Sequence, residues 1–185
     1  MKKITQSLIT CSISCSLTVC IYCCISQAKY VGVRGQTVPM PTPLDQINLH
    51  IRGGYIVPWQ KAENNTFYSR KNPLGLIVAL SDSGTAQGSF FWDDGEGIDT
   101  VERGQYLLTS FAAEPRKLTS QVVVNKLAPA DGLILGVVRV WGAGSAKIAS
   151  ATLTDSAGTQ HQLIPQHHLD TQVRGVLFSQ HSSFI

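Results

Sequence analysis

Residues 47–60 read INLHIRGGYIVPWQ, and this stretch decides the fold class. Its first half places an apolar residue at every second position (Ile47, Leu49 and Ile51), which is the period of a β-strand with one face in water. Gly53-Gly54 interrupts the alternation, and YIV at 55–57 resumes it. The stretch therefore predicts two strands joined by a tight turn at the glycines.

The chain beyond residue 60 continues with short apolar segments between turn residues. Residues 74–80, LGLIVAL, are nearly all apolar, as expected of a strand that is covered on both faces. Turn residues such as Asp82-Ser83-Gly84 and Asp131-Gly132 separate the segments, and no apolar stripe has the 3.6-residue period of a helix. The pattern predicts an all-β protein, an antiparallel β-sandwich. Further strands are expected at Ser89–Trp92, Tyr106–Ala112, Leu118–Asn125, Leu133–Trp141, Lys147–Thr154 and Gln160–Ile164.

Length and charge limit the classes of function. A chain of 185 residues suits one sandwich, whereas a (β/α)8 barrel alone takes about 250 residues. The formal net charge is +3, and Lys2 and Lys3 are two of the 15 basic residues. Residues 1–28 hold no acid, so 13 basic and 12 acidic residues remain in 29–185. This near-neutral body offers no electrostatic basis for binding nucleic acid or an anionic membrane.

Residues 1–28 differ in kind from the rest of the chain. A basic start is followed by a charge-free segment from Leu8 to Ile25 and by Ser26-Gln27-Ala28, which is typical of a cleaved signal peptide. A retained signal-anchor and a non-native leader are the two alternatives, and a membrane contact is expected only if the segment is retained as an anchor. All five cysteines lie in this leader (Cys11, Cys15, Cys20, Cys23 and Cys24), so a cleaved product would have neither a disulfide nor a thiolate metal site.

Two segments of the sequence resemble a known enzyme family. PLDQINLHIRGGYIVPWQ at 43–60 and GSFFWDDGEGIDT at 88–100 resemble the region that follows the catalytic barrel in glycoside hydrolase family 31, and most of all in its vertebrate α-glucosidases. The resemblance implies that residues 29–127 are a barrel-exit segment and a proximal C-terminal β-sandwich. Residues 128–185 would then be a partial second, distal β-sandwich whose end is truncated or divergent.

The same resemblance implies a function. The chain would be a non-catalytic C-terminal part of an α-glucosidase, and it would support the catalytic barrel, its expected partner. The parent enzyme would release glucose from terminal α-1,4 linkages of maltose, starch or glycogen oligosaccharides, in the secretory pathway: secreted, lysosomal or membrane-associated. Two alternatives remain open: an independent secreted carbohydrate-binding β-sandwich that binds oligosaccharide, and a small hydrolase built on Asp94 and Glu96.

The acidic cluster at 93–99 is the sequence's one candidate for catalysis. Glycosidases need two carboxyl groups about 5–9.5 Å apart, whereas the adjacent Asp93 and Asp94 point to opposite sides of an extended chain. Nothing in the pattern selects Glu96 or Asp99 as a second carboxylate. The interpretation adopted is a hairpin turn whose aspartates bond to the local backbone. The resemblance places the family's catalytic aspartates in barrel motifs that are absent from this sequence, so no catalytic residue is predicted.

Cofactor and metal motifs are equally weak. The acidic cluster lacks the glycine and glutamate positions of a calcium loop, and the sequence has no glycine-rich phosphate loop. His161, His167-His168 and His181 have no second pair at a zinc-site spacing. No cofactor and no metal are therefore expected.

Two other features bear on recognition. Trp59, Trp92 and Trp141 stand in apolar surroundings, so packing in the core or between domains is favoured over stacking on a sugar ring. Asn64-Asn65-Thr66 is a sequon for N-linked glycosylation in the polar stretch KAENNT, and it makes Asn64 the predicted glycosylation site.

Overall fold

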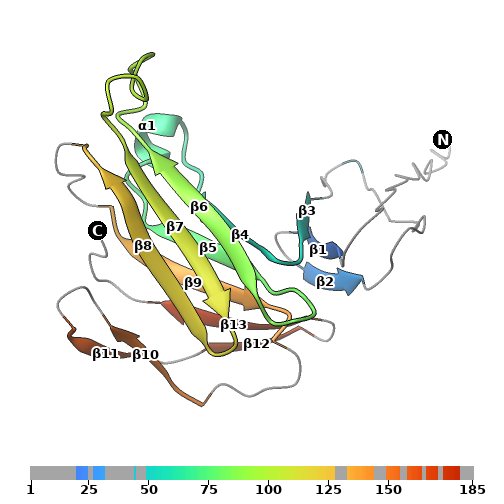
Figure 1. Ribbon diagram of the computed structural model, residues 1–185. Coiled ribbons are helices and arrows are strands. Elements are labelled where there is room, and N and C mark those ends of the chain that lie inside the picture. The colour runs from blue at the N-terminus through green and yellow to red at the C-terminus, as the bar shows by residue number, and fades with distance from the viewer. Residues whose placement is uncertain are drawn as a thin grey trace, which may run out of the picture.

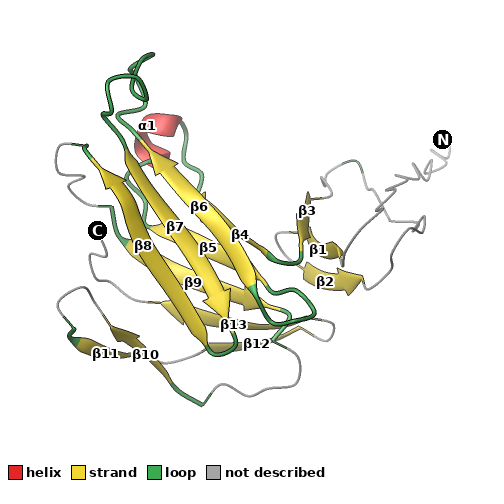
Figure 2. Ribbon diagram, viewed as in Figure 1, coloured by secondary structure: helices red, strands yellow, loops and turns green. Residues whose placement is uncertain are grey.

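A curled eight-stranded sheet forms the body of the protein (Figures 1 and 2). The computed structural model describes residues 20–24, 27–31, 44, 49–127, 133–143, 149–154, 158–163, 166–170 and 173–179. The order of strands in the sheet is β12-β13-β9-β5-β4-β6-β7-β8. The strands are β4 (Tyr55–Gln60), β5 (Leu74–Ala79), β6 (Ala86–Trp92), β7 (Leu107–Glu114), β8 (Lys117–Asn125), β9 (Leu135–Trp141), β12 (Gln166–Asp170) and β13 (Val173–Ser179). The predicted all-β class is confirmed.

Smaller elements flank this sheet. The strand β1 (Cys20–Cys24) lies between β2 (Gln27–Val31) and β3 (Leu49–Arg52), and the strands β10 (Ala151–Thr154) and β11 (Gln160–Leu163) form a hairpin. The predicted leader thus contributes β1, and its predicted cleavage point after Ala28 falls inside β2. The short helix α1 (Thr66–Ser69), which the sequence pattern did not predict, lies in the connection from β4 to β5. Within the described residues, no helix has the length and apolar character needed to cross a membrane.

The sheet is antiparallel except at two places. The strand β5 pairs in parallel with β9, and β4 meets β6 in parallel at Tyr55 and Gln87. The directions of β4, β5 and β6 alternate along the chain, but β6 lies beyond β4 instead of beside β5, and skipping one neighbour makes the β4–β6 pair parallel. The alternation in the sequence predicts strands but not their neighbours, and for this reason the parallel pairs were missed.

The core lies where the curled sheet folds over on itself. Figure 1 shows β6, β7 and β8 crossing in front of β5 and β9. Leu107 of β7 belongs to the same buried cluster as Leu76 of β5, although two strands separate them in the sheet. Burial of these side chains is the main force that holds the two walls together. The cluster comprises Ile56, Leu74, Leu76, Val78, Ala86, Phe90, Leu107, Phe111, Ala113 and Leu133.

The turn between β7 and β8 carries a strained residue. Arg116 follows Pro115 and has φ 72°, a left-handed conformation that favours glycine. At the earlier glycine pair, Gly54 has φ 92°, as the predicted tight turn requires.

The second part of the chain joins the same sheet as the first. The strand β9 pairs with β5 along six residues, and β13 pairs with β9. The predicted division at residue 128 stays a prediction, because residues 128–132 lie outside the described residues.

Candidate interaction surface

The acidic cluster forms the turn that follows β6. The Asp93 carboxylate accepts hydrogen bonds from the Gly95 backbone at 2.9 Å and from the Thr100 hydroxyl at 2.9 Å. The Asp94 carboxylate accepts from the backbone N–H groups of Glu96 at 3.0 Å and Gly97 at 2.9 Å. The predicted turn, with aspartates bonded to the local backbone, is confirmed.

This geometry suits a structural anion better than an acid catalyst. The backbone N–H groups of Gly97 and Glu96 hold the pKa of the Asp94 carboxyl below its ordinary value. A general acid needs the opposite shift, because it must hold its proton near neutral pH. The guanidinium of Arg70 donates to the Asp93 carbonyl and lies 3.7 Å from the ring centroid of Trp92, so it fixes the start of the turn.

The three tryptophans occupy different places. Trp141 is buried with Ala79, and Trp92 packs against the core cluster and stacks on Phe90 at 5.5 Å. Trp59 lies on the opposite face of the sheet from the core, beneath Arg139, whose Cζ is 4.5 Å from the ring centroid. Packing, the favoured interpretation, is thus confirmed for Trp92 and Trp141.

A second apolar face lies across the middle of the sheet, and we call it the outer face. The pairing registers place its members opposite one another on β4, β5 and β9, on the side away from the core. Tyr55 is 45% exposed and Val57 is 38% exposed, and Ile77 and Val137 are half-buried. The face consists of Tyr55, Val57, Trp59, Gly75, Ile77, Ala79, Val137, Arg139 and Trp141.

The two ends of the outer face are covered, and its middle is open. At one end Ile51 of β3 packs with Ile77 against the buried pair Ala79 and Trp141. At the other end the Trp59 ring lies over Gly75 and beneath Arg139. Val57 remains exposed between these two ends, and Tyr55 is exposed beside Ala79 at the first end. The apolar run LGLIVAL was the signal in the sequence, but only the register shows which residues of β4 and β9 complete the face.

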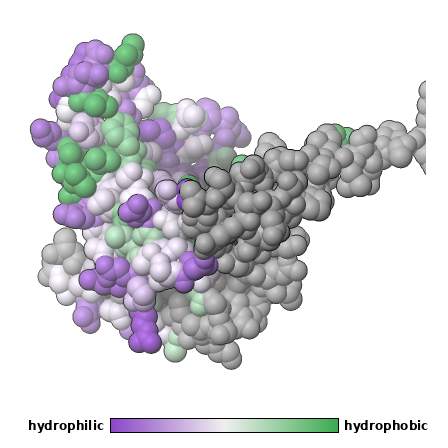
Figure 3. All heavy atoms as spheres, turned by 45° about the vertical axis from the view of Figure 1, so that its right-hand side comes forward, coloured by the Kyte–Doolittle hydropathy of each residue, from purple (hydrophilic) through white to green (hydrophobic). Residues whose placement is uncertain are grey.

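Another group of apolar side chains, exposed at Phe91 and half-buried elsewhere, lies at the far end of β6 and β7. Phe91, 45% exposed, stacks on Tyr106 at 5.2 Å. Phe91 stands opposite Leu108, which in turn stands opposite Val124 of β8. Figure 3 shows hydrophobic residues gathered in the upper part of that view, the end of the sheet that carries α1 and the β6–β7 loop. The sequence did not indicate that Phe91 and Tyr106 form a pair, because only the pairing of β6 with β7 brings them together.

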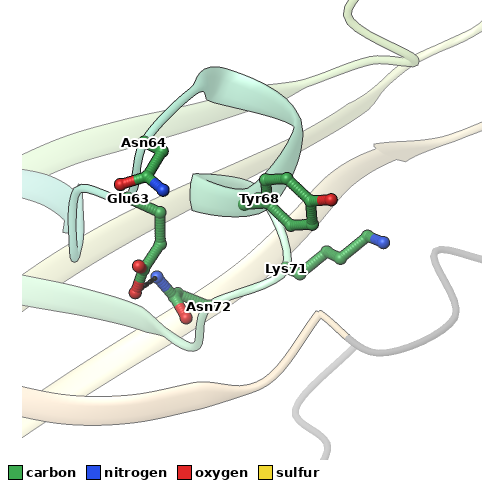
Figure 4. A pocket seen from close by; sticks show the side chains of 5 residues that line it. All are labelled: Glu63, Asn64, Tyr68, Lys71 and Asn72. Carbon is green, nitrogen blue, oxygen red and sulfur yellow. Dashed lines mark hydrogen bonds between the residues drawn. The ribbon is translucent and has the colours of Figure 1, made fainter.

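The segment that carries the sequon is held by its own hydrogen bonds. The Asn72 side-chain amide donates to the Lys61 carbonyl at 2.9 Å and to the Glu63 carboxylate at 3.2 Å. The Asn65 side chain caps α1 by accepting from the Tyr68 backbone at 3.0 Å. A surface hollow of about 410 Å³ lies beside this helix, lined by Glu63, Asn64, Tyr68, Lys71 and Asn72 (Figure 4).

Metal ligation finds no support in the described part of the chain, where no three His, Cys, Asp or Glu residues gather around one point. The side chains of His161 and His167-His168, and the whole of His181, lie outside the described residues. The leader cysteines at 11 and 15 are likewise outside them.

No protein-family model matches the chain. Its sequence is 52% identical to probable maltase-glucoamylase 2 of Homo sapiens over 109 residues. This aligned segment covers 58% of this chain and 4% of the human protein. It is 46% identical over 126 residues to human intestinal sucrase-isomaltase, or 68% of this chain and 7% of that protein. It is 47% identical over 97 residues to lysosomal alpha-glucosidase of Rattus norvegicus, or 52% of this chain and 10% of that protein. The chain thus spans a tenth or less of the length of these curated relatives.

Solved structures agree on the fold. A glucosidase II alpha subunit superimposes with a TM-score of 0.80 at 18% identity, over 97% of this chain and 20% of that one. A GH31 dextranase from Flavobacterium johnsoniae superimposes with a TM-score of 0.67 at 13% identity, over 96% of this chain and 25% of that one. At these identities the likeness shows the fold alone.

Proposed function

We propose, from the relationship of this chain to a segment of the glycoside hydrolase family 31 α-glucosidases, that it is a non-catalytic β-sandwich part of such an enzyme. In this role it supports the catalytic barrel. The whole enzyme would hydrolyse terminal α-1,4-linked glucose from maltose, starch or glycogen oligosaccharides. A place in the secretory pathway fits the intestinal and lysosomal relatives.

The outer face is the observation that carries this proposal. A sheet in water normally has one apolar face, which packs on the core, and one polar face. Here β5 is apolar on both faces, and Val57 and Tyr55 lie exposed beside it. A contiguous exposed apolar patch of this kind marks a protein contact. The barrel of the parent enzyme is the partner we assign to this face.

Reconstitution from two pieces tests the proposal. Human sucrase-isomaltase from which the matching segment is deleted is co-expressed with the full chain, and co-purification and glucose release from maltose are measured. The expected result is that the chain co-purifies and raises the activity of the truncated enzyme. Val57→Lys should abolish both effects, because it places an unpaired charge in an apolar contact.

Gln105→Lys is the matched control. Gln105 is exposed in the loop between β6 and β7, outside the outer face, so this variant adds the same charge without disturbing the contact. A folded chain that neither co-purifies nor changes the activity would overturn the proposal.

One observation favours the second candidate, an independent carbohydrate-binding module. The exposed ring of Phe91, stacked on the half-buried ring of Tyr106, offers apolar surface for a pyranose ring. Amide NMR of residues 29–185, titrated with a maltooligosaccharide, tests it. Saturable shifts that disappear in Tyr106→Ala would support a binding module, and unchanged peaks would contradict it.

A further inference from the structure

The loop between β4 and β5 presents a built attachment site for a sugar. We propose that Asn64 carries an N-linked glycan and that the first sugar of this glycan lies in the hollow beside Tyr68. This inference does not depend on the barrel contact, because the hollow lies at α1 and the outer face lies across β4, β5 and β9.

Asn64 is the residue that is available for modification. It begins the only Asn-x-Ser/Thr sequence without proline at the middle position in the 185 residues, and it is exposed. Its neighbour Asn65 uses its side-chain oxygen to cap α1. No hydrogen bond within the described part of the chain engages the Asn64 side chain, so attachment there breaks no contact of the loop.

The chemistry needs a donor that the cell's secretory pathway supplies, a lipid-diphosphate-linked oligosaccharide. A bond forms between Nδ2 of Asn64 and C1 of the first sugar while the bond from C1 to the diphosphate oxygen breaks. Nδ2 loses one proton, and the lipid diphosphate leaves with the electron pair of the broken bond.

The hollow has the two kinds of wall that a sugar ring requires. Tyr68 offers an aromatic ring, 54% exposed, for the apolar C–H face of a pyranose. Glu63, Lys71 and Asn72 offer charged and amide groups for the hydroxyl and N-acetyl groups. Figure 4 shows Asn64 with Glu63 and Asn72 on one side of the hollow and Tyr68 with Lys71 on the other.

The loop is rigid enough to position the sugar. The Glu63 backbone donates to the Ser69 hydroxyl at 2.9 Å, and the Gln60 side chain donates to the Asn72 carbonyl at 2.7 Å. The Glu63 carboxylate is also paired with Lys61 at 3.2 Å. These bonds hold the two ends of the segment together around α1, so the hollow exists before the glycan is attached.

Attachment is tested on the full chain, expressed in mammalian cells behind a heterologous cleavable secretion signal so that translocation is ensured. Intact mass before and after enzymatic removal of N-glycans is the measurement. One glycan is expected on the parent chain and on Thr66→Ser, and none on Asn64→Gln or Thr66→Ala. Secreted parent chain without a glycan would overturn the proposal.

The position of the first sugar is tested by thermal unfolding of two trimmed forms. One endoglycosidase leaves a single sugar on Asn64, and an amidase removes the whole glycan and leaves aspartate, for which Asn64→Asp is the control. The one-sugar form is expected to have a Tm about 2 °C higher. The difference should vanish in Tyr68→Ala and persist in Val123→Ala, since Val123 is 56% exposed on β8 and does not line the hollow. Equal Tm values for the two trimmed forms of the parent chain would show that the sugar does not occupy the hollow.

Discussion

Gly75 and Trp59 form the tightest side-chain fit on the outer face. A Cβ atom at residue 75 would lie 2.3 Å from both Cε2 and Nε1 of the indole. Only glycine therefore lets the Trp59 ring lie flat over β5, where the guanidinium of Arg139 covers its other side. The position of one tryptophan thus depends on the absence of a side chain in the neighbouring strand.

We expect Gly75→Ala to lower the free energy of unfolding by about 1–3 kcal/mol, because the added methyl group overpacks the indole. Urea unfolding of the full chain, followed by tryptophan fluorescence, measures the change. In a Trp59→Leu background, where the smaller side chain can yield, the cost of Gly75→Ala should fall below about 1 kcal/mol. An equal cost in both backgrounds would show that the indole is not the obstacle.

The loop from β6 to β7 shows how an element-scale feature follows from local bonds. The Asp93 and Asp94 carboxylates accept hydrogen bonds from three successive backbone N–H groups, at residues 95, 96 and 97. Arg70 donates to the Asp93 carbonyl from the neighbouring loop. The loop's exposed residues Ile98 (96%) and Val101 (58%) contribute nothing to this order. The structural role of Asp93 and Asp94 in this turn therefore accounts for the acidic motif.

Asp94→Asn is expected to make the stability of the fold depend less on pH in the acid range. The pKa of Asp94 is lowered in the folded protein, so its stabilising contribution is complete above the ordinary aspartate pKa, about 3.9, and is lost as pH falls through the lowered value. The asparagine keeps the acceptor oxygen but does not titrate. Tm measured at pH 6 and pH 3 should drop less in Asp94→Asn than in the parent.

Glu102→Gln, a change at an exposed acid in the same loop, is the matched control and should leave the drop in Tm as it is in the parent. Identical drops in all three proteins would contradict the role given to Asp94.

At the same scale, the sequence predicted strands better than their assembly. The predicted strand at 106–112 is β7, whose burial alternates, and turn residues at 82–84 and 93–95 marked the two ends of β6. In contrast, α1 is four residues long and buries none of its residues, so it left no periodic signal. The pairing of β1 with β3 was missed because the leader's composition favoured a signal peptide, an expectation that stays a prediction. For the candidate surface, the apolar run at 74–80 was visible in the sequence, whereas its partners Val57 and Val137 required the register.

The whole molecule presents two surfaces that an independent domain would normally protect. One is the outer face, with Tyr55 and Val57 exposed. The other is β8, the last strand in the sheet order, where Leu118, Val122 and Val123 are 38, 44 and 56% exposed. Within the described strands nothing pairs with the free edge of β8, and such an edge invites association with another chain.

These surfaces predict strong binding of an apolar dye such as ANS by the purified body, residues 29–185. Val57→Lys should reduce the fluorescence without lowering Tm, because Val57 lies outside the buried core, and Gln105→Lys should leave the fluorescence unchanged. Pairing with the truncated enzyme should lower the parent's fluorescence as Val57→Lys does, since both remove the same surface from the dye. ANS fluorescence as low as that of an ordinary monomeric protein would show that this chain already covers its outer face. A barrel partner would then not be needed.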